Sequence, residues 1–224
     1  MRDTSANTKK AKRRRRLERD VVLDAAIQVA RRLGTEALTI RDVASELGVS
    51  LMSLYYYVQN REDLINAIVA RVGEQIVHPD QKDNDADEVE AVFLAFYDGV
   101  HNEAWGIHLL VRGHIRSANV LPLAQRALLA LEGMGLNRAA AWHGYISLEH
   151  HLFGEILAIN GYQWQTQESK KSFDESIAEF PVIHEFRREG ETVSDNPRDH
   201  YRRALKRMID ALAAEGSKHS NPSV

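Results

Sequence analysis

Apolar residues recur at intervals of three and four along most of this chain, and that spacing restricts the fold more than any other feature. An α-helix completes a turn in about 3.6 residues, so these intervals place apolar side chains on one helical face. The intervals four, three and four occur near both ends, at Val22, Ala26, Val29 and Leu33 and at Tyr201, Leu205, Met208 and Leu212. No segment alternates convincingly between apolar and polar residues, as a half-buried strand would. The sequence therefore predicts an all-α protein.

Start and stop signals divide the N-terminal part into four predicted helices, over 17–33, 40–47, 51–57 and 61–77. Gly34 and Gly48 stand where helices commonly end, while Thr39, Ser50 and Asn60 can each cap a following helix. Further along the chain, helices are predicted at about 86–103, 105–117, 120–134, 138–161, 174–189 and 198–214.

Four regions follow from composition and connectivity. Residues 1–16 have no apolar period and are expected to be a flexible basic arm. Residues 17–66 and 67–215 are the two helical regions, with the polar, proline-containing segment 78–87 near their boundary. A mobile loop is predicted at 163–173, and 216–224 is predicted to be a disordered tail.

Positive charge is concentrated near the N-terminus. The net charge is −3, yet residues 1–78 hold 14 Lys and Arg against 10 Asp and Glu. A polyanionic partner explains this excess, and a solvated tail is the alternative. The absence of Cys fits a reducing compartment, and no apolar run is long enough to cross a membrane. We therefore expect a cytoplasmic protein without a membrane partner.

The segment from Glu46 to Ser50 joins two short predicted helices in a helix-turn-helix pattern. An apolar first helix is followed by Gly48 at the corner, and Val49 leads into a helix with a polar start. A second helix of this kind can enter the major groove of DNA with its N-terminal side chains facing the bases.

The stretch Leu38 to Ile68, LTIRDVASELGVSLMSLYYYVQNREDLINAI, resembles the DNA-binding segment of the TetR family of transcriptional repressors. The matching residues are Thr39, Gly48-Val49, Leu54-Tyr55, Tyr56-Tyr57 and Asn60-Arg61. The resemblance implies that 17–66 is a three-helix helix-turn-helix DNA-binding domain and that 67–215 binds an effector and forms the dimer. The implied function is that of a homodimeric repressor, which a small molecule releases from a palindromic operator.

The resemblance also implies which residues meet DNA. Tyr55 is expected to turn inward against Leu47, Val49 and Leu64, whereas Tyr56 and Tyr57 face the DNA backbone. Thr39 and Arg61 are expected at phosphates, and Arg41 is the best candidate for reading a guanine. The full set of predicted DNA contacts is Arg14, Arg15, Thr39, Arg41, Ser50, Leu51, Met52, Ser53, Tyr56, Tyr57 and Arg61.

The C-terminal region is expected to hold the effector and to pair two subunits through its last long helices. The segment 138–161 is apolar around most of its circumference, which is typical of a helix enclosed on two sides. One side would face a pocket and the other a second subunit. The predicted effector contacts are Trp105, His108, Arg112, Trp142 and Tyr145.

Histidines are frequent in this region, so a metal site is conceivable there. His143, Ser147 and His151 share a helical face that Glu155 continues. No HExxH or ExxH spacing is present, so neither a metal nor another cofactor is expected. A metal-dependent enzyme and a helical interaction module that does not bind DNA are the alternatives to a regulator. The absence of a Gly-rich phosphate loop and of a cysteine nucleophile argues against an enzyme.

Overall fold

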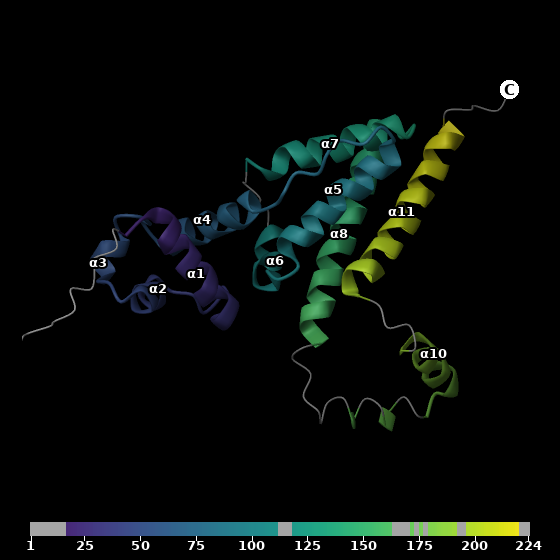
Figure 1. Cartoon of the computed structure of the whole chain (residues 1–224). Coiled ribbons are helices and arrows are strands. Elements are labelled where there is room, and N and C mark those ends of the chain that lie inside the picture. Colours follow the sequence, from purple (N-terminus) through teal and green to yellow (C-terminus); the bar gives the residue numbers. More distant parts are fainter. Residues whose placement is uncertain are drawn as a thin grey trace, which may run out of the picture. The chain divides into compact units, whose positions relative to one another are not determined.

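The computed structural model describes residues 17–111, 118–162, 171–172, 175–176, 179–191 and 196–219 (Figure 1). Within these ranges helices are the only regular elements, which confirms the predicted all-α class. The chain divides into two compact units, Met1–Ile68 and Val69–Val224. In the described ranges, no helix has the length and apolar character that crossing a membrane requires.

The first unit contains α1 (Arg19–Leu33), α2 (Ile40–Leu47), α3 (Leu51–Leu54) and the beginning of α4 (Arg61–Glu74). Helix α2 packs against both α1 and α3. The apolar stripes predicted from the sequence meet in one core, where the fully buried side chains include Val22, Leu38, Val43, Leu54, Val58, Leu64 and Ile68.

Local signals fix the helix ends of this unit. Thr39 and Asp42 form a capping box at the start of α2, and Ser50 accepts a hydrogen bond from the backbone N–H of Ser53 at the start of α3. Gly48 ends α2 in the left-handed region with φ of 64°, a conformation that L side chains rarely adopt. These residues set the direction of the short connection between α2 and α3.

The third helix is shorter than predicted. It ends at Leu54, and residues 55–57 form a turn instead of continuing to Tyr57. Leu54 and Val58 are both fully buried, and the Val58 N–H donates to the Leu54 carbonyl. Leu54 and Val58 thus hold this segment to the core. The three tyrosines between them lie in a turn, so their side chains can point in different directions.

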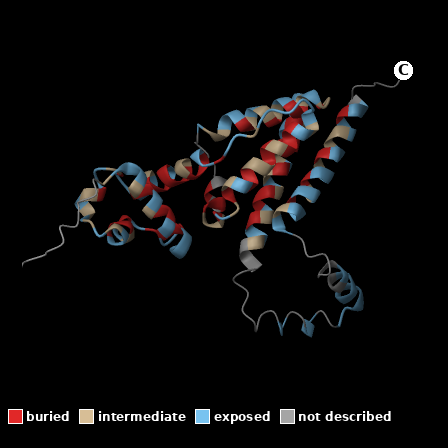
Figure 2. Cartoon of the chain, in the orientation of Figure 1, coloured by how far each residue is buried: buried red, intermediate tan, exposed pale blue. Residues whose placement is uncertain are grey.

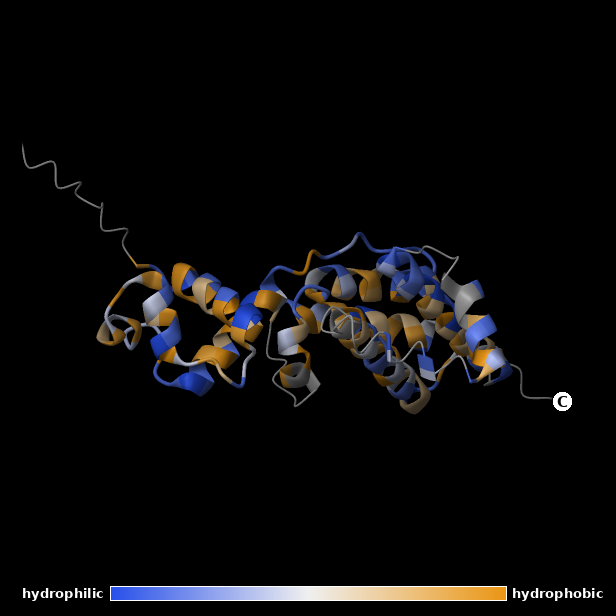
Figure 3. Cartoon of the chain, turned by 90° about the horizontal axis from the view of Figure 1, so that it is seen from below, coloured by the Kyte–Doolittle hydropathy of each residue, from blue (hydrophilic) through white to orange (hydrophobic). Residues whose placement is uncertain are grey.

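The second unit contains α5 (Asp85–Val100), α6 (Ala104–Val111), α7 (Val120–Gly133), α8 (Arg138–Tyr162), α10 (Pro181–Glu191) and α11 (Pro197–His219). Helix α5 packs against α7, α8 and α11, while α8 also packs against α6, α7 and α11. Buried residues concentrate on α5 and α8 (Figure 2). Figure 3 shows hydrophobic and hydrophilic residues interleaved along the helices, as amphipathic packing requires.

The last helix is longer than predicted. Residues 216–219, which the sequence assigned to a disordered tail, belong to α11, and the helix does not stop near 214. Gly216 is buried, and a Cβ atom there would lie 2.2 Å from the Met134 carbonyl oxygen. The glycine therefore permits close packing on the α7–α8 turn instead of ending the helix.

Other predicted ranges differ in their ends or lie outside the described residues. Helix α10 begins at Pro181, later than the predicted residue 174. Residues 112–117 of the predicted helix 105–117, and most of the predicted loop 163–173, lie outside the described residues.

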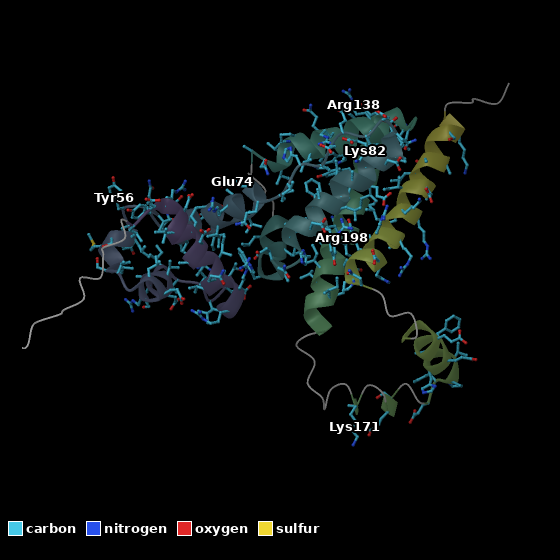
Figure 4. The ribbon with its side chains drawn as sticks, viewed as in Figure 1. Tyr56, Glu74, Lys82, Arg138, Lys171 and Arg198 are labelled. Carbon is cyan, nitrogen blue, oxygen red and sulfur yellow. The ribbon has the colours of Figure 1, made fainter. Side chains whose placement is uncertain are left out.

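Ion pairs connect elements of the second unit. Arg198 at the start of α11, labelled in Figure 4, donates to both oxygens of Asp98 on α5, at 2.6 and 2.8 Å. Arg126 on α7 donates to Glu88 on α5 at 2.6 Å and to the Pro79 carbonyl at 2.9 Å. Burial favours the neutral form of Glu88, but its hydrogen bonds and the Arg126 charge outweigh this and lower its pKa.

Candidate nucleic-acid interface and ligand cavity

The corner between α2 and α3 presents an exposed surface. Met52 and Tyr56 are 77% and 86% exposed, and Figure 4 shows Tyr56 at the outer side of the α3 region. Thr39, Arg41 and Ser50 are also exposed, while Leu51 and Ser53 are half-buried. Arg61 is exposed too, and Tyr57 is half-buried. All the predicted DNA contacts in the described first unit thus have side chains that are at least partly open to solvent.

Tyr55 does not turn inward, so the expectation for this residue was wrong. It is 45% exposed and lines an open groove with residues of α2 and of the α3–α4 connection. The groove is lined by Thr39, Ile40, Arg41, Leu51, Tyr55, Gln59, Asn60 and Arg61. The early end of α3 is the reason, because the chain turns after Leu54 and carries the Tyr55 ring out of the core. Tyr55, Gln59 and Asn60 are candidate contacts that the sequence interpretation missed.

Tyr57 is held inside its own unit. Its hydroxyl donates a hydrogen bond to the Leu17 carbonyl, and its ring meets the Tyr56 ring edge-on at 5.2 Å between centroids. The hydroxyl predicted to reach a phosphate therefore has an internal acceptor. Tyr57 positions both the start of α1 and the neighbouring ring of Tyr56.

Arg61 also has internal partners. Its guanidinium donates to the carbonyl oxygens of Leu38 at 2.9 Å, Thr35 at 2.6 Å and Glu36 at 3.1 Å. These contacts fasten the first residue of α4 to the α1–α2 connection. A phosphate contact by Arg61 would have to share or replace them.

Thr39 combines a capping role with a place in the groove. Both its backbone N–H and its hydroxyl donate to the Asp42 carboxylate, at 3.0 and 2.5 Å. The donors that the sequence interpretation assigned to phosphate therefore bind Asp42 in this structure. Arg14 and Arg15 lie outside the described residues.

The second unit contains a narrow, mainly apolar cavity of about 60 Å³. At roughly 10–15 Å³ per enclosed water, this volume holds about four to six water molecules. The described residues of its lining extend from α4 to α8 and are Val69, Val72, Gly73, Ile76, Phe96, Val100, Glu103, Trp105, Gly106, Val120, Tyr145, Glu149, Leu152 and Phe153.

Two of the five predicted effector residues, Trp105 and Tyr145, line this cavity. Trp142 does not, and it is 50% exposed. The lining residues of α8 occupy positions 145, 149, 152 and 153, so Trp142 lies one turn beyond the end of that stripe, where it stacks on Tyr145. The side chain of His108, and all of Arg112, lie outside the described residues.

Two carboxylates in the lining were missed by the sequence interpretation. Glu103 is only 6% exposed, and the Trp105 indole N–H donates to it at 2.5 Å. Glu149 is half-buried, and burial raises its pKa while the neighbouring His150 acts in the opposite direction. The i, i+4 spacing of Tyr145 and Glu149 was the available sequence signal, since it places both on one face of α8.

The conceivable histidine metal site does not form among the residues that the structure describes. Across those ranges, no three His, Cys, Asp or Glu side chains gather as ligands for a metal. His143 is exposed, whereas His151 stacks on the buried Tyr201 ring, which in turn stacks on Tyr97. His151 belongs to this ring stack and not to a ligand cluster.

Comparison with known proteins identifies relatives of both units. A family profile described as bacterial regulatory proteins, tetR family, matches residues 22–68. A second, the tetracyclin repressor-like C-terminal domain, matches residues 79–215.

One similar protein is the HTH-type transcriptional repressor DrrR1 of Streptomyces coeruleorubidus, 25% identical over 222 residues that cover 86% of this chain and 76% of that protein. Among solved structures, apo ActR of Streptomyces coelicolor has a TM-score of 0.70 and 19% identity, covering 90% of this chain and 97% of ActR. BioQ of Mycobacterium smegmatis has a TM-score of 0.62 and 18% identity, covering 88% and 98%. These structural similarities agree with the observed helical fold.

Proposed function

The chain belongs to the TetR family of bacterial regulatory proteins, and we propose that it is a homodimeric repressor released from a palindromic operator by a small molecule. The family consists of transcriptional regulators, so the chain is a regulator and not an enzyme, as the sequence predicted. A cytoplasmic location accompanies this proposal, since the operator is there.

The observation that carries the proposal is the exposed helix-turn-helix corner. A core of fully buried side chains, among them Leu54 and Val58, holds α3 while Met52 and Tyr56 stay in solvent. Large apolar and aromatic side chains are usually buried, so the exposure of Met52 and Tyr56 on the helix-turn-helix favours a binding surface. Arg41 supplies directional hydrogen bonds for a base or phosphate, and Tyr56 supplies a ring and a hydroxyl for the sugar-phosphate backbone.

Structures of similar proteins support the two kinds of partner. BioQ has been solved with its double-stranded DNA operator, and ActR in complex with actinorhodin. DrrR1 is described as a transcriptional repressor. By analogy, we assign DNA to the first unit of this chain and a small molecule to the cavity of the second.

Dimer formation is proposed through the C-terminal helices. Trp142 and Leu157 on α8 are each about half exposed, although α8 packs against α5, α6, α7 and α11. Contact with a second copy of the chain would bury Trp142 and Leu157. Helix α8 would then be covered on both sides, as expected for a helix that is apolar around most of its circumference. A symmetric pair would present two α3 helices to the two halves of a palindrome.

Helix α4 provides the connection between ligand and DNA in this proposal. Leu64, Ile65 and Ile68 of α4 are buried, while Val69, Val72 and Gly73 of the same helix line the cavity. A ligand that enlarges the cavity therefore acts directly on α4. A differential affinity of about 1–3 kcal/mol between DNA-bound and released conformations would lower operator binding roughly 5- to 150-fold.

The test is titration of the purified protein against promoter DNA of its neighbouring genes, with a random duplex as control, at two salt concentrations. We expect one promoter duplex to bind at least about 1,000-fold more tightly than the random duplex. Equal affinity for all duplexes at both salt concentrations would refute sequence-specific regulation. Sedimentation of the complex then tests whether one duplex carries two copies of the chain.

A further inference from the structure

We propose that Asn119 is a positioning residue that fastens the end of α4 to the start of α7 and thereby favours the conformation that binds the operator. The inference rests on the proposed function, because it names what restrains α4 at the cavity. Three features carry it: the hydrogen bonds of Asn119, the packing of the α4 end on α5, and the place of both beside the cavity.

Asn119 stands at the N-cap position of α7 but does not cap that helix. An Asn at this position commonly accepts a hydrogen bond from its own helix, yet within the described residues of α7 the Asn119 side chain makes no capping bond. Its side-chain amide instead donates to the carbonyl oxygens of Gly73 and Ile76, both at 2.9 Å. Because carbonyl oxygens only accept, the side-chain nitrogen makes both bonds. The Asn119 side chain therefore serves a contact between helices.

These bonds satisfy carbonyl groups at the end of α4. The last carbonyl groups of a helix lack partners within it. Glu74, labelled in Figure 4, is the last residue of α4, and the two carbonyls that Asn119 binds lie on either side of it. His78 adds a third bond, since its Nε2 atom lies 2.8 Å from the Asn119 carbonyl oxygen and donates to it. These three hydrogen bonds are named the Asn119 clamp.

The end of α4 also packs closely against α5. Ile76 is only 5% exposed, and a Cβ atom added at Gly99 of α5 would lie 2.5 Å from the Ile76 Cγ1 atom. An approach this close requires glycine, so Ile76 lies directly on the α5 backbone. Two helices, α5 and α7, thus hold the same short segment.

The Asn119 clamp joins two walls of the cavity. Gly73 and Ile76 belong to the lining on the α4 side, and Val120, the residue after Asn119, belongs to the lining on the α7 side. A donor and an acceptor more than about 3.5 Å apart no longer form a useful hydrogen bond. The clamp therefore stabilises the narrow cavity and contributes nothing once these two walls separate.

This restraint determines how easily a ligand acts on α4. With a volume of about 60 Å³, the cavity must widen to admit a ligand much larger than a few water molecules. Widening between α4 and α7 breaks the clamp, so the ligand must supply the free energy that is lost. In the proposed function, the wider cavity belongs to the conformation with low affinity for the operator. The clamp consequently favours operator binding.

The experiment compares operator affinity of the full-length wild type and of Asn119→Asp, with no ligand added. The substitution keeps the size of the side chain but replaces the donating nitrogen by an oxygen, which repels both carbonyl groups. We expect the affinity for the operator to fall at least about tenfold, because two hydrogen bonds of the operator-binding conformation are lost. Unchanged affinity in a folded variant would refute the positioning role.

His78→Ala is a milder second variant, which keeps the test decisive if Asn119→Asp does not fold. It removes one bond of the clamp at an exposed side chain, where substitution is well tolerated. Operator affinity should fall about threefold, in the same direction as for Asn119→Asp. An affinity equal to that of the wild type would count against the clamp.

Asn137→Ala is the matched control. Asn137 accepts a hydrogen bond from the Ala140 N–H at 3.0 Å, so it caps the start of α8 in the same unit but takes no part in the clamp. This variant should keep operator affinity within about twofold of the wild type. A decrease as large as that of Asn119→Asp would mean that general loss of stability, and not the clamp, explains the effect.

Amide hydrogen exchange of the protein without DNA, followed by NMR, measures the clamp directly. The N–H groups of Gln75 and Ile76 donate to the Val72 and Gly73 carbonyls at the end of α4. Both should exchange at least about tenfold faster in Asn119→Asp and at the wild-type rate in Asn137→Ala. Equal exchange in the wild type and in Asn119→Asp would show that Asn119 does not hold this segment.

The two measurements separate this inference from the proposed function. Faster exchange at the end of α4 with unchanged operator affinity would refute the positioning role and leave the regulator intact. A wild type that prefers no duplex would refute the regulator, and the role of Asn119 in operator binding with it. Hydrogen exchange would still decide whether Asn119 holds the end of α4.

Discussion

Three consecutive tyrosines in the first unit occupy three different environments. Tyr55 lines the groove beside α2, Tyr56 is exposed, and the hydroxyl of Tyr57 donates to the Leu17 carbonyl. The turn that follows α3 separates them, because its residues are not held on one helical face. Removing the side-chain hydroxyl should therefore have a different effect on stability at Tyr57 than at Tyr56.

Tyr57→Phe is expected to lower the free energy of unfolding by about 1 kcal/mol, because it removes an internal hydrogen bond. Tyr56→Phe removes a hydroxyl from a side chain that is 86% exposed and should leave stability unchanged. Urea denaturation of both variants measures the difference. A phosphate contact by the Tyr56 hydroxyl would appear in DNA binding: Tyr56→Phe should then lower the affinity for every duplex by about the same factor, whatever its sequence. Equal stability of the two variants would contradict the internal role of Tyr57.

The two arginines beside the groove are expected to differ in the same way. Arg61→Ala removes three hydrogen bonds to backbone carbonyls and should destabilise the protein by about 1–3 kcal/mol. Arg41→Ala should leave thermal stability unchanged but lose about 1–3 kcal/mol of discrimination at one base pair of the operator. Melting curves and binding to single-base operator variants check the pair. Preserved stability in Arg61→Ala would favour a phosphate role for Arg61 over the structural one.

His151 should make stability depend on pH. Burial lowers its pKa below the ordinary value of 6.5, against the raising effect of Glu155 and with a smaller lowering effect of His200. Between the folded and unfolded pKa values the unfolded chain binds more protons, so stability falls as the pH drops below about 6.5.

His151→Gln removes this titration and should flatten the decline, as measured by urea denaturation between about pH 5 and 7. The exposed His143 provides the control, because His143→Gln should keep the wild-type pH dependence. A decline as steep in His151→Gln as in the wild type would show that other groups cause it.

Close packing between elements depends on a glycine at the end of the chain's last helix. At Gly216 of α11 an added Cβ would lie 2.2 Å from the Met134 carbonyl oxygen, which belongs to the backbone and has little room to move. Gly216→Ala is therefore expected to destabilise the protein by about 1–3 kcal/mol.

Gly154 of α8 is the matched control, since nothing lies within 4 Å of an added Cβ there. Gly154→Ala should stabilise the protein by about 0.5–1 kcal/mol, because alanine favours a helix interior. Thermal unfolding of both variants should thus show melting temperatures that move in opposite directions. Shifts of the same sign would mean that the two helices do not pack as described.

Most helices were predictable because their signals are local. Thr39, Gly48 and Asn60 define ends through their own caps or dihedral angles, and the sequence pattern contained each of them. The predicted ends of α3 and α11 were wrong because tertiary contacts, which a local pattern does not show, determine where these helices end. Leu54 and Val58 are both buried in the core when α3 ends after one helical turn. Gly216 packs closely on the Met134 carbonyl within α11 and does not end that helix.

At the scale of the whole molecule, the residues that line the cavity were less predictable than the exposed corner of the helix-turn-helix. Trp105 and Tyr145 were identified by residue type, but Trp142 has the same character and lies outside the cavity. Glu103 and Glu149 were missed because a sequence shows their charge without the neighbouring helices that bury them. A cavity assembled from five helices depends on packing that single-helix periodicity does not contain.

Electrostatic attraction should make DNA binding by the intact protein strongly dependent on salt. The double variant Arg14→Ala/Arg15→Ala removes two cations of the basic arm, each able to neutralise one phosphate. The slope of log affinity against log salt should become shallower by about 2 for each bound arm. Removing Lys171 and Lys218 instead gives the same change in net charge far along the chain. If the two double variants behave alike, the arm has no specific role at DNA.

Arg61 connects the beginning of α4 to the three carbonyl groups that precede Thr39. Helix α4 consequently cannot slide along its axis without either breaking these hydrogen bonds or carrying the start of α2 with it. If α2 moves with α4, a small axial displacement of α4 would reorient the helix-turn-helix, α2 and α3, as a rigid body. The side-chain contacts within the helix-turn-helix would stay intact. If these three hydrogen bonds were weaker, α4 could move while α2 and α3 kept their orientation. The strength of the Arg61 hydrogen bonds would therefore determine how far a displacement of α4 changes the orientation of the helix-turn-helix.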